Sequence, residues 1–199
     1  MAETELGIRL ELSFKLPTRH GGKLYLQGTN TPEHSAMFEV IGRIVVLWTR
    51  VEYAVEGLVD WLHVPAIANE FPRKFRHRPE GLRAQREFLD LAFREIDVLQ
   101  EYVPELRKFE SWLKRLGSRR NEIIHATRKG IVTTPEGLRL HIRASRKSGQ
   151  TERMLTLDDL DQIATEIGNL GMMAFLFASS VQGSARAKWI AKQAAVTSR

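Results

Sequence analysis

The sequence contains no cysteine. Disulfide bonds and thiolate metal sites are therefore excluded, and this absence is typical of a reducing compartment, so we expect a cytoplasmic protein. No apolar run approaches the roughly 20 residues that a helix needs to cross a bilayer, which predicts no membrane span. The acidic and polar residues 1–5 likewise predict no secretory signal.

Several well-known functional motifs are also missing. The chain has no Walker-type glycine loop, no paired His-Glu metal motif and no glycine-flanked nucleophilic serine. The histidines other than His125 show no ligand spacing; they are His20, His34, His63, His77 and His141. We therefore expect neither a bound metal nor a cofactor.

The bulk composition is ordinary for a globular protein. The 199 residues, of which 43% are hydrophobic and 27% charged, suffice for one domain with a sizeable core. The net charge of +6 and the pI near 9.8 favour a polyanionic partner. Charge alone does not identify that partner, because many basic proteins bind no nucleic acid.

Apolar residues recur at helical spacing in four segments, which predicts helices at 34–63, 80–99, 104–129 and 157–181. A basic, alanine-rich segment at 183–199 is expected to add a terminal helix or tail. Because there is no internal repeat and no second core, residues 1–182 are predicted to form a single domain. Its first three helices lie within residues 34–129.

Period-two alternation predicts β-structure in two places. Residues 1–30 contain an alternating stretch and its return across a turn, which is typical of a hairpin. A second hairpin is predicted within residues 130–156, around Pro135-Glu136-Gly137, with His141 on its polar face. We expect both hairpins to contribute to one small antiparallel sheet, giving an α+β fold that is mainly helical.

The densest chemistry in the chain lies at residues 119–126. Asn121 and His125 are four residues apart and share a helix face, whereas Arg120 and His125 are separated by roughly 140° around the helix. Two copies of the helix across a two-fold axis would close that gap. The preceding Gly117-Ser118 either bends the helix or restarts it, in which case Arg119 to Asn121 would form a phosphate site at a helix N-terminus.

These residue types suit metal-free cleavage of RNA. RNA carries its own nucleophile, the 2′-hydroxyl. A histidine such as His125 can take the proton of that hydroxyl or protonate the leaving 5′-oxygen. An arginine such as Arg120 can neutralise the charge on the phosphate. The alternative is structural: Arg120 forms a salt bridge with Glu52, and His125 is an ordinary exposed histidine.

Glu52 interrupts an apolar column of the first predicted helix. A carboxylate in that position is costly unless it is paired. One interpretation is a structural salt bridge to an arginine of a later helix, most simply Arg119 or Arg120. The other places Glu52 beside the site, where it orients Arg120 or His125.

A second basic segment occupies residues 71–86, where phenylalanines are interleaved with positive charges. We predict that it follows an RNA backbone, with Arg119 extending the same surface. The residues assigned to RNA binding there are Arg73, Lys74, Arg76 and Arg78. The alternative is a solvated loop and helix start.

The sequence Arg120-Asn121-x-x-x-His125 resembles the arginine-x(4–6)-histidine motif of HEPN domains, in which asparagine commonly follows the arginine. The Trp48-x-x-x-Glu52 pattern on a long first helix also resembles that family. The resemblance implies a small helical bundle, often dimeric, in which the arginine and histidine of two protomers form a composite cleft. Many such domains are metal-independent ribonucleases.

The resemblance covers residues 34–181 apart from the hairpin. Glu110-x-x-x-Lys114-Arg115 resembles a further acidic-basic motif of some HEPN ribonucleases, although Glu–Lys pairing along a helix explains it equally well. The resemblance implies a homodimeric endoribonuclease acting on RNA, as a toxin or defence effector, with an antitoxin or another protein as a further partner. The rivals are a non-catalytic HEPN module that binds nucleotide, RNA or protein, and a basic DNA-binding protein.

Overall fold

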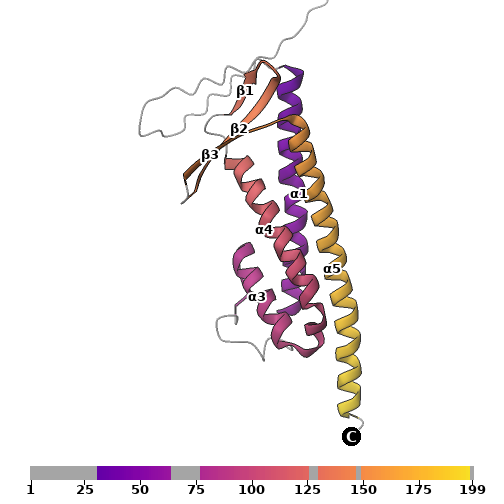
Figure 1. Cartoon of the computed structure of the whole chain (residues 1–199). Coiled ribbons are helices and arrows are strands. Elements are labelled where there is room, and N and C mark those ends of the chain that lie inside the picture. Colours follow the sequence, from indigo (N-terminus) through magenta and orange to yellow (C-terminus); the bar gives the residue numbers. More distant parts are fainter. Residues whose placement is uncertain (1–30, 64–76, 126–129, 147–148, 198–199) are drawn as a thin grey trace, which may run out of the picture.

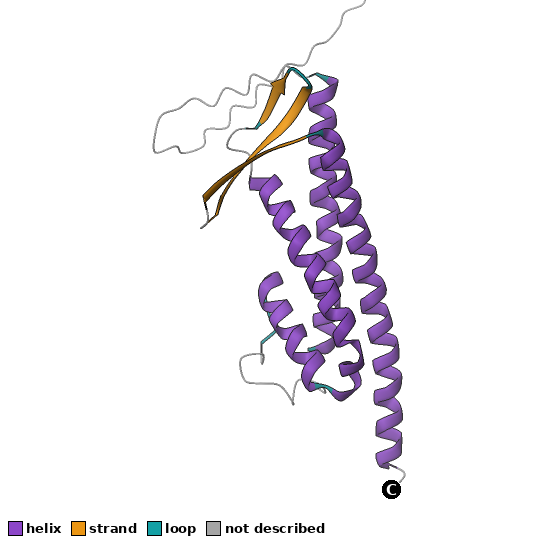
Figure 2. Ribbon diagram, viewed as in Figure 1, coloured by secondary structure: helices purple, strands orange, loops and turns teal. Residues whose placement is uncertain are grey.

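A computed structural model describes residues 31–63, 77–125, 130–146 and 149–197 (Figure 1). Its elements are α1 (Pro32–Leu62), α3 (Gly81–Glu95), the 3-10 helix η2 (Asp97–Tyr102), α4 (Val103–His125), β1 (Ile131–Thr134), β2 (Gly137–Arg146), β3 (Gly149–Leu155) and α5 (Leu157–Thr197). The described chain is therefore a mainly helical α+β fold, as predicted (Figure 2). The predicted N-terminal hairpin lies outside the described residues, as do Arg73, Lys74 and Arg76.

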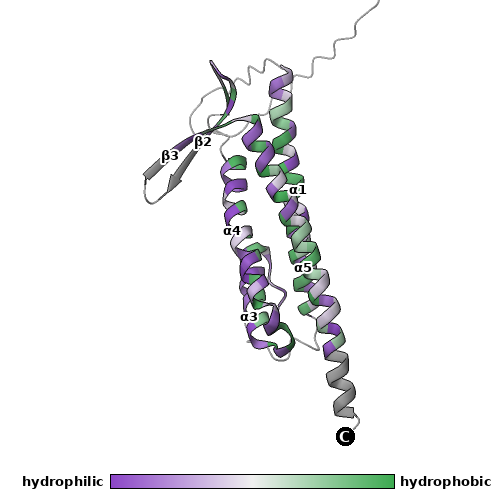
Figure 3. Cartoon of the chain, turned by 45° about the vertical axis from the view of Figure 1, so that its right-hand side comes forward, coloured by the Kyte–Doolittle hydropathy of each residue, from purple (hydrophilic) through white to green (hydrophobic). Residues whose placement is uncertain are grey.

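Helix α1 forms the long axis of the bundle. Thr31 caps it by accepting a hydrogen bond from the backbone N–H of His34, and Pro32 occupies the first turn, where a missing N–H costs nothing. The residues that it buries recur at helical spacing: Met37, Val40, Ile44, Trp48, Val51, Val55, Leu58, Val59 and Leu62. Long hydrophobic stretches on α1 contrast with the hydrophilic residues over much of α3 and α4 (Figure 3).

Helices α1 and α5 lie side by side and run parallel (Figure 1). Contacts between the two helices follow the same order along each of them. They run from the Arg43–Asp161 ion pair to the hydrogen bond that Gln182 donates to the carbonyl of Gly57. Gly171 lies between these contacts, where an added Cβ would be 3.9 Å from the backbone oxygen of Leu47. Gly168 and Gly171 of α5 therefore let the two helices approach closely.

Three helix boundaries differ from those predicted. Helix α3 ends at Glu95, because Ile96 adopts an extended conformation, and a 3-10 helix follows. Helix α4 continues through Gly117 without a restart. Helix α5 runs on to Thr197, although a break was expected near residue 182. No helix within the described residues is both long and apolar enough to cross a membrane.

The sheet follows α4 and packs at the end of the bundle where α4 terminates (Figure 2). It has the antiparallel order β1-β2-β3, with Leu140 paired to Ile131 on one side and to Leu155 on the other. Leu140 is buried, as alternation predicts, but His141 is buried as well. Its Nε2 lies 3.5 Å from a carboxylate oxygen of Glu152, so this residue of the predicted polar face is covered.

Helices α1 and α4 meet where the Trp48 indole lies over Gly117. A Cβ added to Gly117 would be 3.0 Å from Trp48 Cη2 and 3.3 Å from Cζ2, closer than the packed ring allows. We therefore expect Gly117→Ala to lower the free energy of unfolding by about 1–3 kcal/mol through overpacking. Chemical denaturation of the two proteins would measure the difference.

Gly42→Ala is the matched control, because it places the same methyl in α1 where nothing lies within 4 Å. There the better helix propensity of alanine should stabilise the protein by up to about 1 kcal/mol. A Trp48→Phe background, whose smaller ring frees the space, should reduce the cost of Gly117→Ala. Equal effects of the two alanines would contradict the tight contact.

Candidate active site

The predicted catalytic residues lie on the last two turns of α4. Because α4 is continuous from Val103 to His125, the segment from Arg119 to Asn121 lies near a helix C-terminus. The alternative of a phosphate site at a restarted helix N-terminus is therefore wrong. His125 is exposed and is the final helical residue.

Arg120 is half-buried, in line with the buried Leu116 and Ile123 of α4. Its Nη1 donates a hydrogen bond to Oδ1 of Asn121 at 3.0 Å. Its Nε is buried without a hydrogen-bond partner, and no carboxylate of the described residues pairs with its guanidinium. A buried polar atom left unpaired costs about 1–3 kcal/mol, so this arginine is held at a cost in stability.

Arg120 and His125 are not brought together within one chain. Arg120 lies on the line of buried residues that includes Leu116 and Ile123, whereas Asn121 and His125 are both exposed. Among the described residues, no hydrogen bond links His125 to either of the other two. The two residues therefore leave α4 at positions roughly 140° apart, as their spacing predicts, although the guanidinium of Arg120 reaches Asn121 on the face of His125.

Glu52 has a different partner from the one expected. Its Oε1 accepts a hydrogen bond from Nε1 of Trp48 at 2.8 Å, within the same helix. Trp48 contacts Gly117, and the next turn of α1 carries Glu52 away from Arg120, because α1 and α4 run antiparallel (Figure 1). The predicted salt bridge to Arg119 or Arg120 is not formed within the described chain. Glu52 instead fixes the Trp48 ring against α4.

Basic residues assigned to RNA binding are largely paired where the structure describes them. Arg78 forms an ion pair with Asp60 and donates a hydrogen bond to its carboxylate. That hydrogen bond raises the pKa of the Arg78 guanidinium. Arg119 lies 3.6 Å from a carboxylate oxygen of Glu166. Within the described part of the 71–86 segment, the positive charge of Arg78 is therefore already paired with a carboxylate. This pairing favours the interpretation of Arg78 as part of a solvated loop and helix start.

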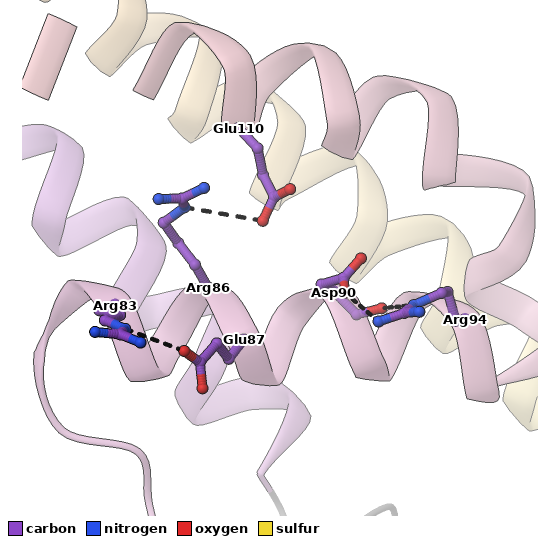
Figure 4. Close-up of polar contacts among 6 residues, drawn as sticks. All are labelled: Arg83, Arg86, Glu87, Asp90, Arg94 and Glu110. Atoms are coloured by element: carbon purple, nitrogen blue, oxygen red, sulfur yellow. Dashed lines mark hydrogen bonds and ion pairs between the residues drawn. The ribbon is translucent and has the colours of Figure 1, made fainter. Parts of the chain in front are cut away.

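The Glu110-x-x-x-Lys114-Arg115 pattern does not form a single cluster. Glu110 faces α3, where Nε of Arg86 lies 3.9 Å from its Oε1 (Figure 4). Burial raises the pKa of the Glu110 carboxyl above its usual value, and the charge of Arg86 partly opposes that effect. Arg115 instead pairs with Glu166 of α5 at 3.3 Å. The acidic Glu110 and the basic Arg115 of this pattern thus pair with residues of different helices.

Sequence reasoning missed a hollow beside the outer face of α4. Its lining comes from α4 and β3: Ser111, Lys114, Arg115, Ser118, Arg119, Glu122 and Arg153. A second hollow adjoins it and shares Arg119, Glu122 and Arg153. The regular spacing of Lys114 and Ser118 along α4 is a signal that could have identified them. Arg153 offered none, because only the fold of β3 places it 3.9 Å from the carboxylate of Glu122.

A third hollow has the opposite character. It is an apolar groove between α1 and α5, lined by Leu47, Thr49, Arg50, Tyr53, Ala54, Gly168, Gly171, Met172 and Phe175. Large apolar side chains project around it, with Tyr53 79% exposed and Phe175 61% exposed. Trp48 lies between Leu47 and Thr49 in α1, but its side chain faces α4 and does not line the groove. This surface is therefore separate from the side of α1 that α4 covers.

No protein-family model matches the chain, and no curated protein or solved structure is significantly similar to it. Membership of the HEPN family therefore stays a prediction from the motif. Within the described residues, no three His, Asp or Glu side chains are grouped so that they could hold a metal ion. The candidate site consists of Arg120, Asn121 and His125, with the hollow on α4 beside them.

Proposed function

We propose that the protein is a HEPN-type, metal-independent endoribonuclease whose site is completed by a second copy of the chain. The observation that carries this proposal is Arg120. Its guanidinium is half-buried, and no carboxylate among the described residues pairs with it. It lies at the same end of α4 as the exposed His125. Residues kept in costly, unpaired environments are frequent at functional sites.

The proposed reaction needs only groups of the protein and of RNA. His125 accepts the proton of a 2′-hydroxyl as its oxygen attacks the adjacent phosphorus. The bond from phosphorus to the 5′-oxygen breaks, and that oxygen leaves with the proton that His125 accepted from the 2′-hydroxyl. The products are a 2′,3′-cyclic phosphate and a 5′-hydroxyl. Arg120, aligned by Asn121, stabilises the extra charge of the phosphate in the transition state.

A second chain is part of the proposal because of the geometry of α4. Arg120 and His125 leave the helix at positions roughly 140° apart, and no hydrogen bond joins them within the described chain. A two-fold axis beside the carboxyl end of α4 would place Arg120 of one protomer opposite His125 of its partner. Each of two equivalent clefts would then contain one residue of each kind.

The products of the reaction test this proposal. We expect purified protein to cleave unstructured RNA in the presence of EDTA, leaving 2′,3′-cyclic phosphate and 5′-hydroxyl ends. A substrate with a single 2′-deoxy nucleotide at the cut site should resist, because it lacks the nucleophile. Mass spectrometry of the fragments identifies both ends. Fragments ending in a 3′-hydroxyl, or cleavage that needs added metal, would refute the mechanism.

The apolar groove favours a second candidate function. A non-catalytic HEPN module would bind a protein partner, such as an antitoxin, through exposed apolar side chains like those of Tyr53 and Phe175. Such patches commonly mark interaction surfaces. The two candidates use different surfaces, since the groove lies on α1 and α5 and the catalytic candidates lie on α4. A protein that cleaves no RNA but keeps a partner on this groove would support the second.

A further inference from the structure

The outer face of α4 carries a continuous polar stripe. Its members follow steps of four and three, so at about 100° per residue they lie in one row along the helix. They are Arg107, Ser111, Lys114, Ser118, Asn121 and His125, and all are exposed. At 1.5 Å per residue the stripe is about 27 Å long. It ends at the candidate general acid and base.

The stripe contains no acidic residue, although α4 has three acids. Glu110 is turned toward Arg86 of α3, and Glu122, whose side chain is only 15% exposed, lies near Arg153. Glu105 is confined to the first turn of the helix. The hollow described above opens on the middle of the stripe, at Lys114 and Ser118.

We infer that this stripe is the track for the RNA backbone, with Lys114 and Arg153 holding phosphates on either side of the hollow. The inference rests on the proposed ribonuclease function and specifies where its substrate lies. Cationic side chains attract the phosphates, and the serine hydroxyls can donate hydrogen bonds to them. A backbone bound along this row reaches His125 directly. The arginine-rich segment before α3 is not needed for this path.

Binding can be measured without cleavage by using a fluorescein-labelled, single-stranded 2′-O-methyl oligonucleotide. It carries the phosphates but cannot supply the attacking hydroxyl. Each phosphate contact on a single strand contributes about 0.7 to the slope of log affinity against log salt. Lys114→Ala/Arg153→Ala should therefore reduce that slope by about 1.4 and weaken binding by about 25-fold at 0.1 M salt, as anisotropy would show.

Arg94→Ala/Lys188→Ala is the matched control, because it also removes two exposed positive charges, one from α3 and one from α5. It should leave the slope unchanged and the affinity within about twofold. Ser118→Glu, which adds a negative charge in the middle of the stripe without touching the sheet, should weaken binding as well. Circular dichroism melting would confirm that each variant folds.

The outcomes separate this inference from the proposed function. Equal affinity and salt slope in the stripe and control variants would overturn the track, even if the wild-type protein cleaves RNA. Weaker binding by the stripe variants would support the track, even if the wild-type protein cleaves nothing and the ribonuclease proposal fails. A wild-type protein that binds neither this oligonucleotide nor unmodified RNA at 50 mM salt would overturn both.

Discussion

Replacing His125 by alanine is expected to lower the rate of RNA cleavage by about 10²–10⁴, the usual contribution of general acid and base catalysis. The side chain is exposed at the end of α4, and among the described residues it forms no hydrogen bond with Arg120 or Asn121. Its loss should therefore leave the fold unchanged. Single-turnover cleavage with excess enzyme isolates the chemical step.

His77→Ala is the matched control for this experiment. His77 is also exposed, but it lies just before α3 and not on α4. Its replacement should leave the cleavage rate unchanged, because the proposed reaction needs only the histidine of α4. RNA cleavage that persists at the wild-type rate in His125→Ala would assign the activity to another group or to a contaminating nuclease. In that case the non-catalytic candidate becomes the better description of the protein.

The helical core could be predicted because its information is local. The steps of four and three from Met37 to Leu62 identify one long helix, and the burial of Ile44 and Val51 confirms its inward face. The same spacing on α4 placed Arg120 among apolar neighbours, and the structure shows it half-buried there. Periodicity specifies a helix and its buried side before any tertiary contact is known.

Partners of charged residues could not be predicted in the same way. The carboxylate of Glu52 accepts a hydrogen bond from Trp48 of the same helix. Arg115 instead pairs with Glu166, which is 51 residues away in the chain. The Arg115–Glu166 pair depends on which helices are neighbours, and the lack of an arginine partner for Glu52 depends on the antiparallel course of α1 and α4. A carboxylate in an apolar column indicates that some partner is required, but it does not identify that partner.

The candidate site shows the same division between local and distant information. Arg120, Asn121 and His125 are one local pattern, so the sequence alone could place them on one helix. Arg153 joins the hollow beside α4 only because β3 pairs with β2 and returns toward Glu122. The burial of His141 has a similar origin, since alternation along a strand predicts its two faces but not whether both are covered.

The requirement for two chains is open to a decisive test by heterodimers. Arg120→Met keeps most of the apolar stem of the arginine and removes the charge, so it should fold, and as a homodimer it should lose about 10²–10³ in rate. We expect a heterodimer of Arg120→Met with His125→Ala, purified through two different tags, to recover about half of the wild-type rate. One of its two clefts receives an intact Arg120 from one protomer and an intact His125 from the other.

The reciprocal heterodimer, wild type with the Arg120→Met/His125→Ala double variant, should be as inactive as either mutant homodimer. Its intact Arg120 and His125 belong to the same chain, and each faces a cleft whose other residue is missing. If a single chain formed the whole site, the two results would be exchanged: the first heterodimer would be inactive and the second would keep about half of the rate. Such an exchange would require Arg120 and His125 of one α4 to converge on one phosphate from positions roughly 140° apart around the helix. With the whole site on one chain, the carboxyl end of α4 would no longer need a partner. The apolar groove between α1 and α5 would then be the candidate surface for contact between two copies.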